Sequence, residues 1–240
     1  MTDSVSIIIP GYNEEKRILR TLTTLCRFCE ENIETYEILF VDDGSTDHTW
    51  EWVNEFNAPS LRPIRLTRNR GKGAAVREGM FRARGRYRFF TDADLPYELD
   101  AILTAMDLFH TSGCDIVVGA RDLPGSVDRA GLSRLRKMAS RAFSAITARL
   151  LEIEVRDSQC GFKGFTAHAA ETLFSQSTIR GYAFDVEILA LARVLDLHIC
   201  RAPVTLVENQ GSRIRLARDG LSMLIDLVRL RARQRAGGSR

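Results

Sequence analysis

The chain of 240 residues is long enough for one α/β domain with a full hydrophobic core, and too short for two such domains. Its content of 45% apolar and 27% charged residues excludes a disordered or membrane-embedded chain, and no apolar run is as long as a membrane-spanning helix. The net charge of +3 is uneven, because the residues from Arg213 onward carry +6 and leave −3 for residues 1–212. Such a basic block indicates an anionic partner.

Strand-like runs alternate with helical patterns along the first half of the chain. The predicted strands are 5–10, 36–41, 61–67, 87–92 and 114–120, and the predicted helices between them are 14–30, 47–56, 73–84 and 98–110. This alternation is typical of an α/β fold with a mostly parallel central sheet and helices on both faces.

Two segments of the second half combine apolar residues at helical spacing with arginines. They are residues 132–151 and the segment that contains Leu221, Leu224, Ile225 and Val228. We predict two basic amphipathic helices, which either pack on the core or lie on an anionic membrane.

The five cysteines are odd in number and scattered, which predicts reduced thiols inside a cell. Cys26 and Cys29 form a C-x-x-C within a helical pattern, with no second pair or histidine nearby, so we expect packed helix residues and no metal site. The first strand begins too close to Met1 to leave space for a signal peptide. We therefore expect a cytoplasmic protein that contacts the cytoplasmic face of a membrane peripherally.

Polar segments follow all five predicted strands, at the strand ends where parallel sheets bind ligands. In chain order they are "PGYNEE", "DDGSTD", "TRNRGKG", "TDAD" and "ARD". In "FFTDADLP", Asp92 and Asp94 occupy alternate positions at a strand end, so the pleat would direct both carboxylates to one side of the sheet. Two such carboxylates suit Mg²⁺ or Mn²⁺ together with phosphate oxygens, and the alternative is capping of the helix that follows Pro96.

Two glycine-containing loops are candidate nucleotide contacts. In "VDDGSTD", Asp47 can cap the next helix and Gly44 can adopt a positive φ, which leaves Asp42 or Asp43 to accept hydrogen bonds from a base or sugar. In "RNRGKG", the glycines permit a tight entry to a helix N-terminus that favours phosphate, and Lys72 adds a positive charge. A plain acidic turn and a solvated basic loop are the alternatives. The first strand is not followed by G-x-G-x-x-G, which disfavours a dinucleotide oxidoreductase.

Six motifs together resemble the inverting family 2 glycosyltransferases with the GT-A fold, above all the polyprenyl-phosphate (dolichyl-phosphate) hexosyltransferases. In order they are "SIIIPGYNEE", "VDDGSTD", "NRGKGAAVREG", "FFTDADLP", "VVGAR" and "RDSQCGFKGF", between residues 5 and 213. The resemblance implies a GT-A domain over 1–213 and a basic amphipathic tail over 214–240. "DSQCGFK" resembles the glucosyl branch and favours UDP-glucose, whereas Pro96 stands where some relatives have a metal ligand.

The resemblance also implies roles for individual residues. Pro10, Tyr12 and Glu14 would line the nucleotide pocket, Asp42 with Asp43 would bind the base or sugar, Lys72 would lie near the nucleotide, and Asp92 with Asp94 would hold Mg²⁺ or Mn²⁺. Gln159, Asp185 and Glu187 would border the sugar and the acceptor, and Arg121 and Arg213 would face the acceptor phosphate.

The expected reaction transfers a hexose, with glucose as the preferred candidate, from a nucleotide sugar to a polyprenyl phosphate. A phosphate acceptor is largely ionised near neutral pH, so the reaction needs no strong base, and the four histidines stand singly. One alternative donor is GDP-mannose, and one alternative acceptor is a glycan or another non-lipid molecule, for which Asp185 or Glu187 would act as the base. The alternatives to a glycosyltransferase are a nucleotidyltransferase and a catalytically silent, nucleotide-binding partner subunit. We expect no nucleic-acid partner; a homodimer or a membrane-anchor partner is possible.

Overall fold

The computed structural model of the chain describes residues 3–129, 160–207 and 225–232, together with residues 131, 147, 149 and 223. Most of the predicted helix 132–151, Gln159 and Arg213 lie outside the described residues.

The centre of the molecule is a seven-stranded sheet with the order β3-β2-β1-β4-β7-β5-β8. Its strands are β1 (Ser4–Gly11), β2 (Thr35–Asp42), β3 (Leu61–Arg65), β4 (Tyr87–Phe90), β5 (Ile116–Ala120), β7 (Lys163–Thr166) and β8 (Ile199–Pro203). β7 is antiparallel to both β4 and β5, and the other neighbours pair in parallel. The mostly parallel sheet predicted from the sequence is therefore confirmed, with one antiparallel strand inserted from the second half of the chain.

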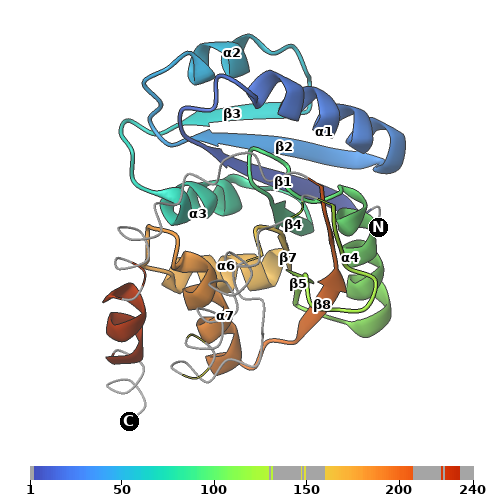
Figure 1. Cartoon of the computed structure of the whole chain (residues 1–240), viewed down its shortest axis with the longest axis vertical. Coiled ribbons are helices and arrows are strands. Elements are labelled where there is room, and N and C mark those ends of the chain that lie inside the picture. Colours follow the sequence, from blue (N-terminus) through green and yellow to red (C-terminus); the bar gives the residue numbers. More distant parts are fainter. Residues whose placement is uncertain are drawn as a thin grey trace.

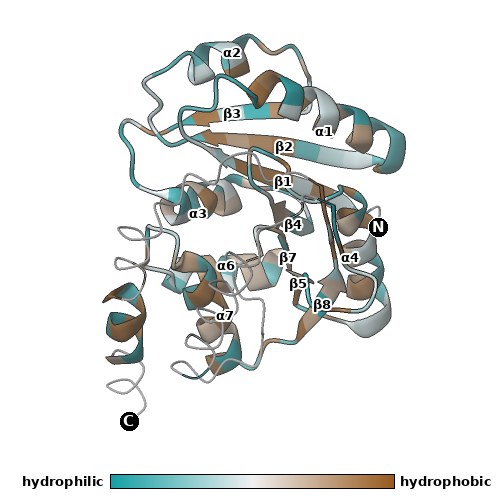
Figure 2. Ribbon diagram, in the orientation of Figure 1, coloured by the Kyte–Doolittle hydropathy of each residue, from teal (hydrophilic) through white to brown (hydrophobic). Residues whose placement is uncertain are grey.

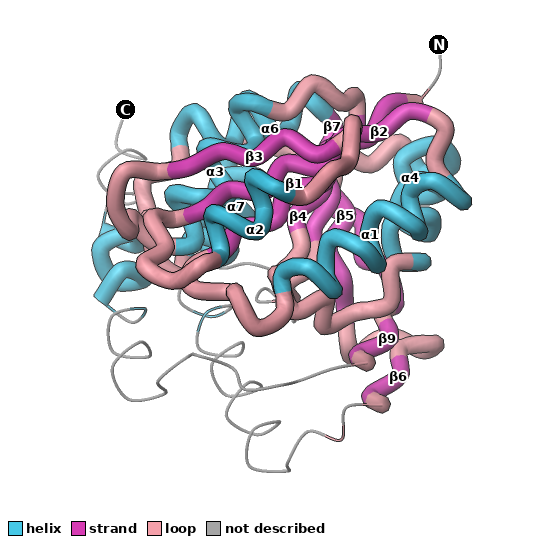
Figure 3. The backbone as a smooth tube through the Cα atoms, turned by 90° about the horizontal axis from the view of Figure 1, so that it is seen from above, coloured by secondary structure: helices cyan, strands magenta, loops and turns pink. Residues whose placement is uncertain are grey.

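Helices cover both faces of this sheet, as predicted (Figure 1). One face carries α1 (Ile18–Asn32), α2 (Thr49–Glu55) and α4 (Asp100–Ser112), and the other carries α3 (Lys72–Arg82), α6 (Ala167–Gln176) and α7 (Phe184–Val194). Strand β1 shows why both faces are buried: Ile7 and Ile9 enter the first core and Ile8 enters the second. Seen from above, β6 (Val127–Asp128) and β9 (Thr205–Leu206) form a separate two-stranded sheet at one edge (Figure 3).

The cysteines agree only partly with the sequence prediction. Cys26, Cys29 and Cys160 are free and buried, and the first two pack on the inner side of α1 as predicted. Cys114 and Cys200, in contrast, form a disulfide with their Cα atoms 5.9 Å apart. The prediction of reduced thiols is wrong for this pair, because their separation of 86 residues conceals that β5 and β8 are neighbouring strands.

The described part of the C-terminal segment is helical and packs on the core formed by α3, α6 and α7. Leu227 and Leu230 are buried in that core, whereas Ile225 and Val228 are 43% and 60% exposed. Figure 2 shows apolar and polar residues mixed along this segment, as an amphipathic pattern requires. Core packing is thus confirmed for one side of the segment. No helix within the described residues is long and apolar enough to cross a membrane.

Candidate active site

The carboxyl ends of β1, β2 and β4 lie side by side, because β1 pairs with both other strands. Gly11 at the end of β1 is opposite Asp42 at the end of β2, and the amide of Thr91, after β4, donates a hydrogen bond to the carbonyl of Ile8 at 3.1 Å. The loops that follow these strands therefore meet at one edge of the sheet. This arrangement brings together the predicted nucleotide and metal residues from three separate parts of the sequence.

Asp92 and Asp94 lie in a turn and not on the strand itself. Strand β4 ends at Phe90, so the prediction that a strand pleat directs both carboxylates is wrong. In the turn, the amide of Leu95 donates to the carbonyl of Asp92 at 3.0 Å, and the hydroxyl of Thr21 donates to the carbonyl of Ala93 at 2.6 Å. Leu95 has a φ of 42°, a left-handed conformation that costs on the order of 1–3 kcal/mol for a residue of this type.

The capping alternative for these aspartates is also wrong. Helix α4 begins at Asp100, and its N-cap residue, Leu99, makes no side-chain capping hydrogen bond. The carboxylates instead face two cations: Lys72 Nζ is 2.5 Å from Asp92 Oδ1, and a guanidinium nitrogen of Arg17 is 3.8 Å from Asp94 Oδ2. The turn thus presents two acidic groups whose charge is only partly balanced by the protein.

The electrostatics of this turn are set by burial and by neighbouring charges. Burial and then the charge of Asp92 raise the pKa of Asp94, and Arg17 opposes them only in part. For Lys72, burial lowers the pKa, but the charges of Asp92 and Asp185 raise it by more, so the ammonium group stays protonated. The charged form of Asp94 is therefore destabilised, first by burial and then by the Asp92 charge, and a bound cation would stabilise it.

A buried ion pair lies behind Lys72. Lys163 Nζ donates to Asp185 Oδ1 at 2.7 Å and to the carbonyl of Cys160 at 2.8 Å, and the Lys163 side chain has no solvent exposure. Its ammonium group also lies 5.5 Å from the centre of the Phe90 ring. Lys163 was not predicted to be a site residue, although it belongs to the "RDSQCGFKGF" motif. The pair places Asp185 close enough to Lys72 to influence the charge of that lysine.

Asp43 and Glu187 have carboxylates that are already occupied by backbone contacts. The two oxygens of Asp43 accept from the amides of Arg70 and Gly71 at 2.7 and 2.8 Å. Glu187 accepts from the side chain of Ser177, from the amide and hydroxyl of Thr178 and from the amide of Ile179, at 2.8–3.0 Å. These two residues hold the segments 70–71 and 177–179 in place. Their predicted contacts with substrate stay predictions.

Asp42 differs from Asp43, because one of its oxygens accepts no hydrogen bond from the described residues. Its side chain is fully buried, and Oδ1 accepts from the amide of Ser45 at 3.0 Å. Oδ2 lies 3.3 Å from Arg65 Nε, close enough for an ion pair, but makes no hydrogen bond within the part of the chain that the structure describes. A buried acceptor without a donor is costly, so Asp42 is the better candidate to receive a ligand N–H. Gly44, two residues later, has a φ of 72°, as the sequence indicated.

The loop after β1 is tied to the loop after β2. Asn13 has a φ of 57°, its amide donates to Ser45 Oγ at 2.8 Å, and the amide of Thr46 donates to Asn13 Oδ1 at 2.8 Å. The amide of Glu14 donates to Thr49 Oγ1 at 2.6 Å, and the Glu14 carboxylate pairs with Arg17 at 3.1 Å. Asn13 and Arg17 were not predicted to be site residues, although Asn13 lies within the "PGYNEE" motif.

The remaining predicted residues occupy different positions. Pro10 is buried within β1, Tyr12 is 36% exposed just after that strand, and Arg121 directly follows β5 at the same edge of the sheet. Gln159 and Arg213 lie outside the described residues. Gly161, two residues after Gln159, passes so close to Asp92 that a Cβ atom there would be 2.4 Å from Asp92 Oδ2. The described part of the "DSQCGFK" motif, residues 160–163, therefore reaches the acidic turn through Gly161.

Comparison with known proteins shows which family the chain resembles. Residues 6–174 match the family model described as glycosyl transferase family 2. The chain is 35% identical to the dolichyl-phosphate beta-glucosyltransferase of Dictyostelium discoideum, over 97% of this chain and 75% of that protein. It is 32% identical to the Homo sapiens protein of the same name, over 100% of this chain and 78% of that protein.

Solved structures show the same fold at lower sequence identity. Glucosyl-3-phosphoglycerate synthase from Mycobacterium tuberculosis, in complex with Mn²⁺, UDP and glucosyl-3-phosphoglycerate, matches with a TM-score of 0.70 and 18% identity, over 96% of this chain and 80% of that one. Mannosyl-3-phosphoglycerate synthase from Rubrobacter xylanophilus matches with a TM-score of 0.72 and 18% identity, over 99% and 76%. The predicted GT-A fold is thereby confirmed.

Proposed function

Because the chain belongs to glycosyl transferase family 2 and is therefore a glycosyltransferase, we propose that it transfers glucose from UDP-glucose to a polyprenyl or dolichyl phosphate, with inversion at the anomeric carbon. The names of its relatives support the donor sugar and the acceptor. The observation that carries the proposal is the turn of Asp92 and Asp94 beside Lys72, at the edge where the loops after β1 and β2 meet.

The nucleotide would bind along the ends of β1 and β2. The Asp42 oxygen that accepts no hydrogen bond from the described residues is an acceptor for the ring N–H of uracil. Tyr12 offers an exposed ring directly after Gly11, the β1 residue that lies opposite Asp42 in the sheet. Asp43 would position the nucleotide-binding loop and not contact the nucleotide itself, because its hydrogen bonds with Arg70 and Gly71 hold the loop that leads into Lys72. Pro10 and Glu14 complete this predicted set.

The residues at the turn fit a divalent cation. Asp92 and Asp94 are 33% and 27% exposed, so both carboxylates are accessible, and partial burial followed by the charge of Asp92 raises the pKa of Asp94. Asp92 and Asp94 would hold Mg²⁺ or Mn²⁺, which would neutralise charge on the departing diphosphate. Lys72 supports the same role, since the charges of Asp92 and Asp185 raise the pKa of its ammonium group by more than burial lowers it. The group therefore stays charged and can contact a phosphate oxygen.

The acceptor needs positioning more than deprotonation. A phosphate monoester is mostly ionised near pH 7, so its oxygen can attack the anomeric carbon while the bond from that carbon to the diphosphate oxygen breaks. Asp185 is engaged with Lys163, which favours a positioning role for it over that of a general base. Arg121, and Arg213 by the resemblance alone, would attract the acceptor phosphate. This assignment accounts for a site without a histidine.

Membrane contact would come from the C-terminal segment. Ile225 and Val228 are exposed beside Arg229, on a helix whose other side is buried in the core. Exposed apolar residues next to cations are typical of helices that lie at an anionic bilayer surface. We therefore place the protein peripherally, at the cytoplasmic face where a nucleotide sugar is available.

The test of the function uses purified protein, Mg²⁺ or Mn²⁺, a panel of UDP- and GDP-sugars and a short polyprenyl phosphate, with mass spectrometry of the lipid fraction. The expected result is a hexosyl lipid formed from UDP-glucose and abolished by EDTA. Asp94→Asn should reduce turnover by at least about 100-fold, because it removes one of two metal-binding carboxylates. Asp107→Asn, at an exposed site on α4, is the matched control and should retain activity. UDP release without a lipid product would assign a different acceptor.

Membrane contact is tested separately by sedimentation with anionic vesicles. Replacing Ile225 and Val228 by serine should weaken binding, and the effect should be larger than that of Val194→Ser on α7, where the valine is 67% exposed. Equal binding of the three proteins would reject the membrane role of the C-terminal segment and leave the chemistry untouched.

A further inference from the structure

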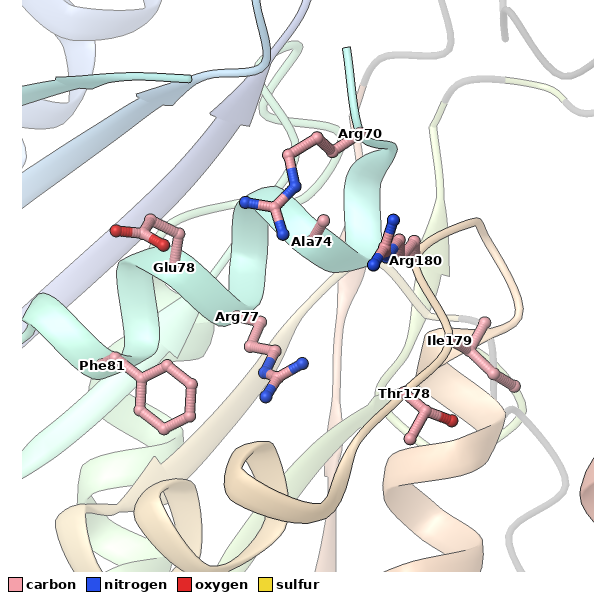
Figure 4. A pocket seen from close by; sticks show the side chains of 8 residues that line it. All are labelled: Arg70, Ala74, Arg77, Glu78, Phe81, Thr178, Ile179 and Arg180. Atoms are coloured by element: carbon pink, nitrogen blue, oxygen red, sulfur yellow. The ribbon is translucent and has the colours of Figure 1, made fainter. Parts of the chain in front are cut away.

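A second basic site lies on the outer side of α3, away from the sheet. A pocket of about 230 Å³ opens between α3 and the segment 178–180. Figure 4 shows the side chains of Arg70, Arg77 and Arg180 around this space, with Phe81 and Ile179 at either side. Neither Lys72 nor the acidic turn of Asp92 and Asp94 lines it. The pocket is therefore separate from the residues assigned to the nucleotide sugar.

The charge of this pocket is unbalanced. Among the residues that the structure describes, Arg70, Arg77 and Arg180 have no carboxylate within ion-pair distance. Glu78 is the acidic residue that lines the pocket, and its carboxylate already pairs with Arg82 at 2.6 Å. Three guanidinium groups that share a small space repel one another unless an anion lies between them. The pocket thus has the electrostatics of an anion site.

The segments that form the pocket are held by buried contacts. Asp43 binds the amides of Arg70 and Gly71, and Glu187 binds the amides of Thr178 and Ile179. The two sides also meet directly, because a Cβ atom on Gly71 would be 2.5 Å from the carbonyl oxygen of Arg180. Gly71 accordingly has a φ of 97° and permits this approach. The backbone of the pocket is therefore pre-organised, which lowers the entropic cost of binding.

We propose that this pocket binds a phosphate ester, either a free phosphorylated metabolite or the headgroup of an anionic lipid. Guanidinium groups bind phosphate oxygens through paired, charge-assisted hydrogen bonds, which distinguishes them from lysines. The volume is below the roughly 300–1,000 Å³ of ordinary ligand pockets, so it suits a headgroup and not a whole nucleotide. Phe81, which is 47% exposed and lies under the Arg77 guanidinium at 5.5 Å, adds an apolar surface beside the charges.

This assignment goes beyond the proposed transfer reaction. Helix α3, which forms one wall of the pocket, lies on the same face of the sheet as the C-terminal helical segment (Figure 1). Leu227 and Leu230 of that segment are buried in the core on this face. Its walls continue into Lys72 on one side and into α7, with Asp185, on the other. An anion held between Arg77 and Arg180 would therefore stabilise the two segments that position the charged residues of the site.

The experiment measures binding of glycerol 3-phosphate by calorimetry and of vesicles by sedimentation. The vesicles are phosphatidylcholine alone and an equimolar mixture with phosphatidic acid. The double variant Arg77→Gln with Arg180→Gln should weaken binding about 100-fold, because each of the two charge-assisted contacts accounts for roughly tenfold. The matched control is the pair Arg84→Gln with Arg86→Gln, which removes the same charge from exposed positions outside the pocket. The double variant Arg77→Lys with Arg180→Lys should retain binding only in part, because lysine lacks the paired donors.

The outcomes separate the two sources of phosphate. Loss of glycerol 3-phosphate binding in the double variant supports a free ester, and loss of vesicle binding alone supports a lipid headgroup. Binding of both probes by the double variant at the level of the control pair overturns the proposal, and so does wild-type protein that binds neither. UDP binding, followed in the same calorimeter, reports on the donor site independently, so a failure of this pocket and a failure of the proposed function give different results.

Discussion

The buried pair of Lys163 and Asp185 provides a quantitative prediction about stability. Lys163 has no exposed side-chain surface and Asp185 has 6%, and their charged atoms are 2.7 Å apart. The substitution Lys163→Met preserves most of the side-chain volume but leaves the Asp185 carboxylate buried without its hydrogen-bonded cation. Removing one partner of a buried pair typically costs about 3–5 kcal/mol in the free energy of unfolding. For a chain of this length the melting temperature should fall by roughly 6–20 °C.

The assay is urea unfolding followed by circular dichroism at neutral pH, with three variants. Lys163→Met should lose about 3–5 kcal/mol, and the double variant with Asp185→Asn should recover much of that loss, because no buried charge then lacks a partner. Arg82→Met is the matched control, because it breaks an ion pair at the surface. In that pair the Arg82 side chain is 56% exposed and the Glu78 side chain 28% exposed, so the substitution should cost less than about 1 kcal/mol in the free energy of unfolding.

A loss below about 1 kcal/mol in Lys163→Met, or a double variant as unstable as the single one, would refute the reasoning. Such a result would mean that Asp185 is not held by this lysine. Asp185 would then be available as a base, which would favour an acceptor that must be deprotonated over an acceptor phosphate.

Three further predictions concern packing, pH and thiols. Gly73→Ala should destabilise the protein by about 1–3 kcal/mol in urea unfolding and reduce turnover, because the new methyl group would lie 2.7 Å from the carbonyl oxygen of Ile179. Burial raises the pKa of Glu37, but hydrogen bonds from Ser6, Arg84 and Arg62 lower it by more, to a value below its usual range. The stability that Glu37 contributes is therefore complete above the unfolded-state pKa of 4.5 and is lost as the pH falls through the lower folded-state value, so Glu37→Gln should flatten the acid limb of a stability–pH curve. Finally, alkylation of denatured protein should modify three cysteines before reduction and five after it, and a count of five without reductant would contradict the disulfide.

The sequence by itself determined the type of fold and the positions where its chemistry lies. Alternating strand and helix patterns suffice for this, because the periodicity of apolar residues follows directly from which faces of each element are buried. The motifs "PGYNEE", "DDGSTD" and "TDAD" could be assigned to strand ends for the same reason, and the structure brings those ends together. Local φ requirements were readable as well, as Gly44 shows.

The tertiary structure decided which atoms of those motifs are available. Asp42 and Asp43 are indistinguishable in the sequence, yet Asp42 has one oxygen without a hydrogen bond from the described residues, whereas Asp43 uses both oxygens. The reason is that only Asp43 faces the amides of Arg70 and Gly71. The role of Lys163 depends on the packing of β7 against the start of α7, which brings Asp185 to the lysine. The disulfide between Cys114 and Cys200 depends on β5 and β8, far apart in the chain, becoming neighbours, and no local pattern records either contact. Hydrogen bonds and ion pairs act over a few ångströms in space, whereas sequence patterns report burial along the chain, so the fold could be predicted and the partners could not.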